Sequence, residues 1–192
     1  MIAMVDYGAG NVRSVENALE RLGAEARITA DAAVIRAADK VIFPGVGAAG
    51  AAMEKLRSTG LDQVLPTLTQ PFLGVCLGLQ IMCTALEEDA TTGLGIFPEA
   101  VRRFPGGLKV PHMGWNSIED LRSPLMEGIA PGSDVYFVHS YYAERGPATI
   151  ARCRYGLDFS AAIRRDNFFG VQFHPEKSAA PGAKVLENFL AL

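Results

Sequence analysis

The sequence predicts an α/β fold: an open, mostly parallel, twisted sheet with helices on both faces and an antiparallel or mixed extension in its C-terminal half. In the first half of the chain, short apolar segments alternate with helix-like segments, as in strand–helix–strand units. Nearly continuous apolar strands of this kind suit a sheet that is covered on both faces. After Gly93, strand-like segments follow one another with turns and no obvious helix between them, which is typical of antiparallel pairing.

The strands expected in the first half are IAMV (2–5), ARI (26–28), KVIF (40–43) and PFLGV (71–75). A helix is expected from Val12 to Leu22, where apolar residues recur at helical spacing, with Asn11 as its N-cap and Gly23 as its stop. A second helix is expected after PGVGAAG (44–50), through Leu56, and a third from Leu77 to about Glu88.

The second half is expected to hold four strand-like segments and a closing helix. The strands are VYFVHSYY (135–142), ATIARCR (148–154), SAAIRR (160–165) and FFGVQFHP (168–175), and the helix is PGAKVLENFL (181–190). Because the chain contains no internal repeat, low-complexity tract or clear linker, a single domain is expected over residues 1–192.

Composition narrows the classes of function. The net charge is -3 and no basic patch stands out, so neither a nucleic acid nor a membrane surface is an expected partner. No apolar segment approaches the roughly 20 residues that span a bilayer. Three cysteines do not suggest a disulfide framework, and the start MIAMVDYGAG lacks the basic region of a signal peptide. We therefore expect a cytoplasmic protein.

One cysteine, Cys76, lies at the expected end of the fourth strand. Gly74 and Gly78 flank it at i−2 and i+2, which is the pattern of a nucleophile elbow with Cys in place of Ser. Ligands bind beyond the carboxyl ends of strands in open α/β sheets, and the start of the following helix favours a thiolate. We predict that Cys76 is a nucleophile, whereas Cys83, within the helix, and Cys153, within a strand, are packing residues.

A thiol nucleophile needs a base, and the chain has three histidines. Pro175 restricts His174 to extended conformations, and residues two apart in extended backbone project to the same side. The segment HPE therefore predicts His174 as the base and Glu176 as the carboxylate that orients it. His139, which ends a strand, and His112, in the loop LKVPHMGWN, are alternative bases without an acid two residues later. We expect them near a site wall and in a recognition loop.

Acyl chemistry also requires donors for an oxyanion. The N–H of Leu77, directly after the nucleophile, is one expected donor. The segment PGVG (44–47) is the other candidate, because glycine-rich backbone can approach a substrate closely.

These segments are similar to a known family. GVCLGLQ with the later HPEKS resembles the class I, or triad, glutamine amidotransferases. VDYGAGNVRSV, FPGVGA, KVPHMGWN and VHSYY resemble, within that class, the glutaminase subunits of imidazole glycerol phosphate synthase. The resemblance covers essentially the whole chain. It implies that Cys76 attacks the side-chain amide of glutamine to form a glutamyl thioester, and that His174 protonates the departing ammonia and then activates water. The backbone of Leu77 and Val46 would bind the oxyanion.

The resemblance also implies ligands and a partner. Glutamine would be held by Gly47, Gln80, Glu88, Ser140 and Tyr141, without a cofactor or a metal. Ammonia would pass to a cyclase subunit with a (β/α)₈ barrel, in a heterodimer that makes imidazole glycerol phosphate for histidine biosynthesis. The residues expected at the contact with the cyclase are Asn11, Pro111, Met113, Trp115, Tyr136 and Lys177.

Two other interpretations remain open at this stage. A self-contained cysteine hydrolase acting on γ-glutamyl compounds would use the same three residues but would work without a partner. A non-catalytic binding module would keep the fold, but the intact set of Cys76, His174 and Glu176 argues against it.

Overall fold

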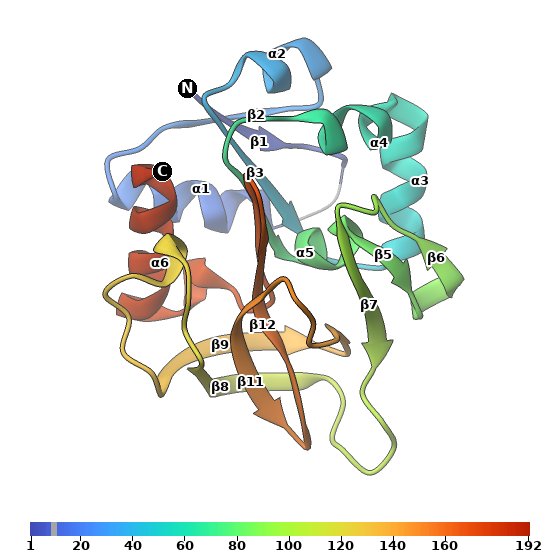
Figure 1. The fold of residues 1–192 in the computed structure, drawn as a ribbon. Coiled ribbons are helices and arrows are strands. Elements are labelled where there is room, and N and C mark those ends of the chain that lie inside the picture. The colour runs from blue at the N-terminus through green and yellow to red at the C-terminus, as the bar shows by residue number, and fades with distance from the viewer. Residues whose placement is uncertain (9–10) are drawn as a thin grey trace.

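The computed structural model describes residues 1–8 and 11–192 (Figure 1). Ala9 and Gly10, which belong to the segment VDYGAGNVRSV, lie outside the described residues. Within the described residues the chain forms a nine-stranded sheet, in the order β2-β1-β3-β4-β13-β12-β11-β8-β9, and a four-stranded sheet, in the order β10-β7-β5-β6.

The larger sheet is built from β1 (Ile2–Val5), β2 (Ala26–Thr29), β3 (Lys40–Gly45), β4 (Phe72–Cys76), β8 (His112–Glu119), β9 (Ser133–His139), β11 (Thr149–Tyr155), β12 (Leu157–Arg165) and β13 (Phe168–Val171). The smaller one is built from β5 (Cys83–Leu86), β6 (Thr91–Thr92), β7 (Phe97–Arg103) and β10 (Tyr141–Ala143). The helices are α1 (Val12–Arg21), α2 (Ala32–Ala37), α3 (Ala49–Thr59), α4 (Leu61–Val64), α5 (Leu77–Met82) and α6 (Ala179–Ala191).

The larger sheet confirms the predicted fold class. Pairing is parallel from β2 through β1, β3 and β4 to β13, and antiparallel from β13 through β12, β11 and β8 to β9. The antiparallel extension is as wide as the parallel part. The first three strands of the parallel part come from the start of the chain, whereas β13 comes from its end, next to β4. This neighbour relation brings the two ends of the expected site together.

Helices cover both faces of the parallel strands, as their apolar sequences predict. Figure 1 shows α1 and α6 on one side of the sheet and α3, α4 and α5 on the other. Successive strand residues point to opposite faces: Met4 and Leu73 pack with α1 and α6, whereas Val5 and Phe72 pack with α2 to α5. In the described residues, no helix combines the length and the hydropathy needed to cross a membrane.

The helix after Cys76 is shorter than predicted. It ends at Met82, and Cys83, expected within it, begins β5 instead. The carbonyls of Ile81 and Met82 accept hydrogen bonds from the backbone of Leu94 and Ile96, so the end of the helix is tied to a later loop. As a result, Glu88 reaches the site from a separate turn.

A second correction concerns His112. The sequence places it in a loop, but it is the first residue of β8, paired across the sheet with His139 of β9. The sequence does not predict this strand because its apolar residues Met113 and Trp115 are exposed, whereas the opposite face carries the buried His112.

Candidate active site

Cys76 lies on a sharp elbow between β4 and α5. Its φ is 54° and its ψ is -108°. Residues other than glycine rarely adopt this backbone conformation, and those that do cluster at functional sites. The elbow depends on bare backbone at the flanking glycines. A Cβ on Gly78 would lie 2.0 Å from the carbonyl oxygen of Phe43, and one on Gly74 would lie 2.5 Å from the sulfur of Met82.

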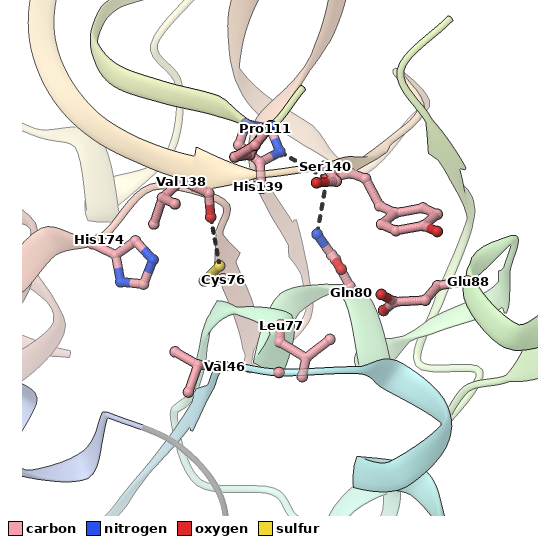
Figure 2. Close-up of a pocket in the computed structure, with 12 residues that line it drawn as sticks. Val46, Cys76, Leu77, Gln80, Glu88, Pro111, Val138, His139, Ser140 and His174 are labelled. Carbon is pink, nitrogen blue, oxygen red and sulfur yellow. Dashed lines mark hydrogen bonds between the residues drawn. The ribbon is translucent and has the colours of Figure 1, made fainter. Parts of the chain in front are cut away.

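His174 reaches the sulfur from the neighbouring strand. Because β13 runs parallel to β4, with Val171 opposite Val75, the segments that follow the two strands leave the sheet at the same edge. His174 Nδ1 lies 2.8 Å from Glu176 Oε1, and the two side chains are 3% and 1% exposed. His174 Nε2 is buried without a hydrogen-bond partner among the described residues, and Figure 2 shows the ring facing Cys76. Nε2 is therefore the atom available to exchange a proton with the sulfur.

The charges around His174 favour its protonated form. Burial alone would lower the pKa of the ring, but the interactions with Cys76 and Glu176 outweigh burial and raise the pKa to about 10. A raised pKa means that the proton is held at neutral pH and is lost only as the pH rises through that value. The site therefore suits an imidazolium that can give its proton to a leaving group.

A residue that the sequence prediction missed, Gln172, lies behind the sulfur. It is fully buried, its Nε2 lies 3.8 Å from Cys76 Sγ, and its Oε1 accepts a hydrogen bond from Gln80 Nε2 at 3.1 Å. An N–H directed at the sulfur stabilises negative charge on it. The signal in the sequence was a single polar residue inside the apolar run FFGVQF.

The elbow opens into a cavity of about 320 Å³. Beside Cys76 and His174 it is lined by all seven residues predicted for the oxyanion and for glutamine: Val46, Gly47, Leu77, Gln80, Glu88, Ser140 and Tyr141. Pro111, Val138 and His139 complete the lining. The cavity thus gathers residues from β4, α5, β9 and β10, and from loops that include the one directly after β3.

Hydrogen-bond acceptors lie at the end of the cavity away from His174. Glu88 and Gln80 occupy this end (Figure 2). Glu88 Oε2 accepts the backbone N–H of Ala49 at 2.9 Å. Gln80 Nε2 donates to Tyr141 O and to Gln172 Oε1, so the free polar atom of the Gln80 amide is its acceptor oxygen. A carboxylate and an amide oxygen at one end of a small cavity suit a ligand that carries an ammonium group.

Comparison with known proteins identifies the family. The family model for class-I glutamine amidotransferases matches residues 3–192. The imidazole glycerol phosphate synthase subunit HisH of Bacteroides thetaiotaomicron is 52% identical over 194 residues, which cover 100% of this chain and 99% of that protein. HisH of Methanothermobacter thermautotrophicus is 48% identical over 200 residues, covering 100% of this chain and 98% of that protein. The chain belongs to the HisH family of class-I glutamine amidotransferases.

A solved structure supports the fold of this HisH-family chain. A crystal structure described as a glutamine amidotransferase superposes with a TM-score of 0.78 at 21% identity, covering 100% of this chain and 98% of that one. The family membership confirms the resemblance predicted from GVCLGLQ, HPEKS and KVPHMGWN, and with it the prediction of a glutamine amidotransferase subunit.

In this HisH-family site the two alternative bases, His139 and His112, already make hydrogen bonds through their ring nitrogens. His139 lines the cavity, as predicted, but its Nδ1 bonds Tyr141 O at 2.7 Å and its Nε2 lies 2.9 Å from His112 Nδ1. His112 Nε2 lies 3.2 Å from Asn116 Nδ2. Because all four ring nitrogens have partners, neither histidine is free to take a proton from Cys76.

Of the residues predicted for the cyclase contact, Pro111 lines the cavity, whereas Asn11 precedes α1 and accepts a hydrogen bond from Ser14. Met113 and Trp115 are 61% and 55% exposed. Trp115 packs edge-on against Tyr136, and the Nζ of Lys177 lies 6.0 Å from the centre of the Tyr136 ring. Because Pro111 lines the cavity, this exposed apolar face is continuous with the site.

The other two thiols are packing residues, as predicted. Cys83 and Cys153 are fully buried, and burial is the main cause that raises the pKa of both thiols, that of Cys153 to about 12. Neither lines the cavity. They serve as matched controls for the chemistry expected of Cys76.

Proposed function

We propose that this chain hydrolyses glutamine through Cys76, His174 and Glu176 and passes the ammonia to a cyclase subunit for imidazole glycerol phosphate synthesis. The observation that carries the proposal is the arrangement of His174. Its Nδ1 is held by Glu176, while its buried Nε2 has no hydrogen-bond partner among the described residues and faces a cysteine on a strained elbow.

The chemistry follows from this arrangement. The Cys76 thiolate attacks the side-chain amide carbon of glutamine, and the new S–C bond gives a tetrahedral oxyanion. Imidazolium Nε2 of His174 gives its proton to the departing nitrogen, so that the C–N bond breaks and ammonia leaves a glutamyl thioester. Neutral His174 then takes a proton from water as the water attacks the thioester, and glutamate is released while the thiolate and imidazolium are restored.

Two backbone segments next to the sulfur supply the donors for the oxyanion. Leu77 is the first residue of α5, and the first N–H groups of a helix have no partner within the helix. Val46 and Gly47 line the cavity across from it, and Gly47 has a φ of 100°, which glycine adopts without strain. Both segments can direct N–H groups at the oxygen of the reacting amide.

The acceptor end of the cavity recognises the α-ammonium group of glutamine. Glu88 supplies the negative charge and Gln80 supplies its side-chain oxygen. Gly47, Ser140 and Tyr141, which line the same cavity, border the α-carboxylate. This division places the side-chain amide of glutamine at the sulfur.

The product requires a partner. Ammonia is protonated in water at neutral pH and then has no lone pair with which to attack, so it must travel to the second site without entering solvent. The exposed face around Met113 and Trp115 adjoins the cavity at Pro111, and exposed aromatic residues are frequent anchors of interfaces. We propose that a (β/α)₈-barrel cyclase docks there as the second chain of a heterodimer, with Asn11, Tyr136 and Lys177 also in contact.

The test is glutaminase activity with and without the cyclase. The chain alone is expected to release glutamate slowly, and the complex to release it about tenfold faster or more when the cyclase ligand, a phosphoribulosyl-formimino aminoimidazole carboxamide ribotide, is bound. Glutamate release is measured in each mixture. Full activity of the isolated chain on γ-glutamyl compounds, with no stimulation, would instead establish the stand-alone hydrolase.

Replacing Glu176 with glutamine is expected to move the alkaline limb of the pH profile to lower pH. Glu176 helps to raise the pKa of His174, and glutamine keeps the shape of the side chain but removes its charge. The imidazolium then loses its proton at lower pH, by about one pH unit or more. The measurement is kcat/KM for glutamine in the complex from pH 6 to 10, about the range in which the two proteins should differ. An unchanged alkaline limb would contradict the role of Glu176.

A further inference from the structure

A continuous line of hydrogen bonds joins β8 to the wall of the cavity. Asn116 Nδ2 lies 3.2 Å from His112 Nε2, His112 Nδ1 lies 2.9 Å from His139 Nε2, and His139 Nδ1 lies 2.7 Å from Tyr141 O. Both histidines are buried. The proposed chemistry uses neither of them.

The direction of every bond in this line is determined by its ends. A carbonyl oxygen can only accept, so His139 Nδ1 carries the hydrogen that meets Tyr141 O. In a neutral ring His139 Nε2 is then an acceptor, and His112 Nδ1 must be the donor to it. His112 Nε2 is left as an acceptor for the Asn116 amide. Burial is the main cause that lowers the pKa of His112 to about 4 and that of His139 to about 3, which agrees with neutral rings.

The far end of the line is anchored to backbone as well. Asn116 Nδ2 also donates to Arg154 O at 3.0 Å, and Asn116 Oδ1 accepts from the backbone N–H of Ser117 at 2.9 Å. These two contacts fix which side of the Asn116 amide faces His112. The line therefore has one consistent set of hydrogen positions between two backbone carbonyls.

The near end of the line reaches the nucleophile. Tyr141 O accepts from both His139 and Gln80, at 2.7 and 2.9 Å, and Figure 2 shows both side chains directed at this one backbone oxygen. Gln80 in turn bonds Gln172, whose Nε2 lies 3.8 Å from Cys76 Sγ. A displacement of the Tyr141 carbonyl would disturb both the acceptor end of the cavity and the donor behind the sulfur.

The opposite face of β8 is the exposed one. Successive residues of a strand point to opposite sides. In β8, His112 and Asn116, which belong to the hydrogen-bonded line, therefore lie on one face, and the exposed Met113 and Trp115 lie on the other. One strand thus carries the proposed docking residues on one side and the line to the cavity on the other. Stacking of His112 on Phe137 and Tyr155, with ring centres 4.9 and 4.1 Å apart, holds the line in place.

We propose that His112 and His139 are positioning residues. When the cyclase docks on β8, they couple the position of this strand to the glutamine cavity through the Tyr141 carbonyl and Gln80. This inference rests on the proposed function, because it needs a glutaminase that a partner stimulates. In it, the partner fixes β8, the fixed strand holds both imidazoles in a single tautomer, and the tautomer holds the carbonyl that orients Gln80.

Two substitutions at His112 separate this role from packing. His112→Phe keeps an aromatic ring for stacking but removes the donor to His139. His112→Asn loses the ring but keeps an N–H close to the place of Nδ1. If this line of hydrogen bonds transmits docking to the cavity, which we call the relay, His112→Phe should lower stimulated kcat/KM for glutamine by about tenfold. His112→Asn should retain most of the stimulated kcat/KM. Tyr155→Phe, which keeps the stack and removes only the hydrogen bond to Lys109 O, is the matched control and should resemble the unchanged protein.

The complex with the cyclase is assayed with glutamine, and co-elution of each variant with the cyclase in size-exclusion chromatography shows that the variant folds and docks. The opposite order, with His112→Phe near the unchanged protein and His112→Asn impaired, would overturn the relay and leave packing as the role of His112. Nitrogen NMR of the complex gives a second test, because both rings are expected as the Nδ1–H tautomer. Detection of Nε2–H on either ring would also overturn it. A lack of stimulation in the unchanged complex would instead refute the proposed function.

Discussion

Replacing Cys76 with alanine is expected to abolish glutamine-dependent turnover of the complex while sparing turnover with ammonium salt. Among the residues that the structure describes, no other thiol lines the cavity. Because water cannot replace a covalent nucleophile at the elbow, the loss should be on the order of 10⁵-fold. Ammonium supplies the cyclase directly and needs no chemistry from this chain. The measurement is product formation by the complex with each nitrogen source.

Cys153→Ala is the matched control for this substitution. Cys153 is buried in β11 and its thiol is held protonated, so its loss should cost some stability and leave glutamine use intact. If Cys76→Ala failed to co-elute with the cyclase, Cys76 would have a structural role. If it kept glutamine-dependent turnover, the proposed mechanism would be wrong.

The parts of the site that the sequence predicts are those that adjoining backbone fixes. Glycines at i−2 and i+2 indicate the elbow at Cys76, and a proline between His174 and Glu176 sets those two side chains on one side of the chain. Such features are written in a few consecutive residues. The sequence does not predict the parallel pairing of β13 with β4, because FFGVQFHP is expected within the antiparallel or mixed extension.

The parts that the sequence does not predict depend on contacts between distant segments. The helix after Cys76 ends early because the carbonyl groups of Ile81 and Met82 accept hydrogen bonds from a loop twelve or more residues later in the chain. His112 enters a strand because β9 pairs with it. The contact of Gln172 with the sulfur requires Gln80 on another element. Local propensity carries little information about partners of this kind.

The glycine after the elbow should be the most sensitive small residue of this region. Gly78→Ala is expected to destabilise the protein by about 3 kcal/mol, which corresponds to a fall in Tm of about 6 to 12 °C for a chain of this size. The added Cβ would lie 2.0 Å from the carbonyl oxygen of Phe43 and 3.1 Å from its carbonyl carbon. These are backbone atoms of a central strand, β3, so no side chain can rotate away to make room.

Relief of this clash requires α5 to move away from β3, and the movement would carry the elbow with it. Glutamine-dependent turnover should therefore fall along with stability, whereas ammonium-dependent turnover should persist below the new Tm. Gly106→Ala is the matched control, because no atom of the described part of the chain lies within 4 Å of its added Cβ, and its effect should stay within about 0.5 kcal/mol. Thermal unfolding of the two variants side by side decides the matter: equal Tm values would mean that β3 and α5 do not approach as closely as their backbone contact at Gly78 requires.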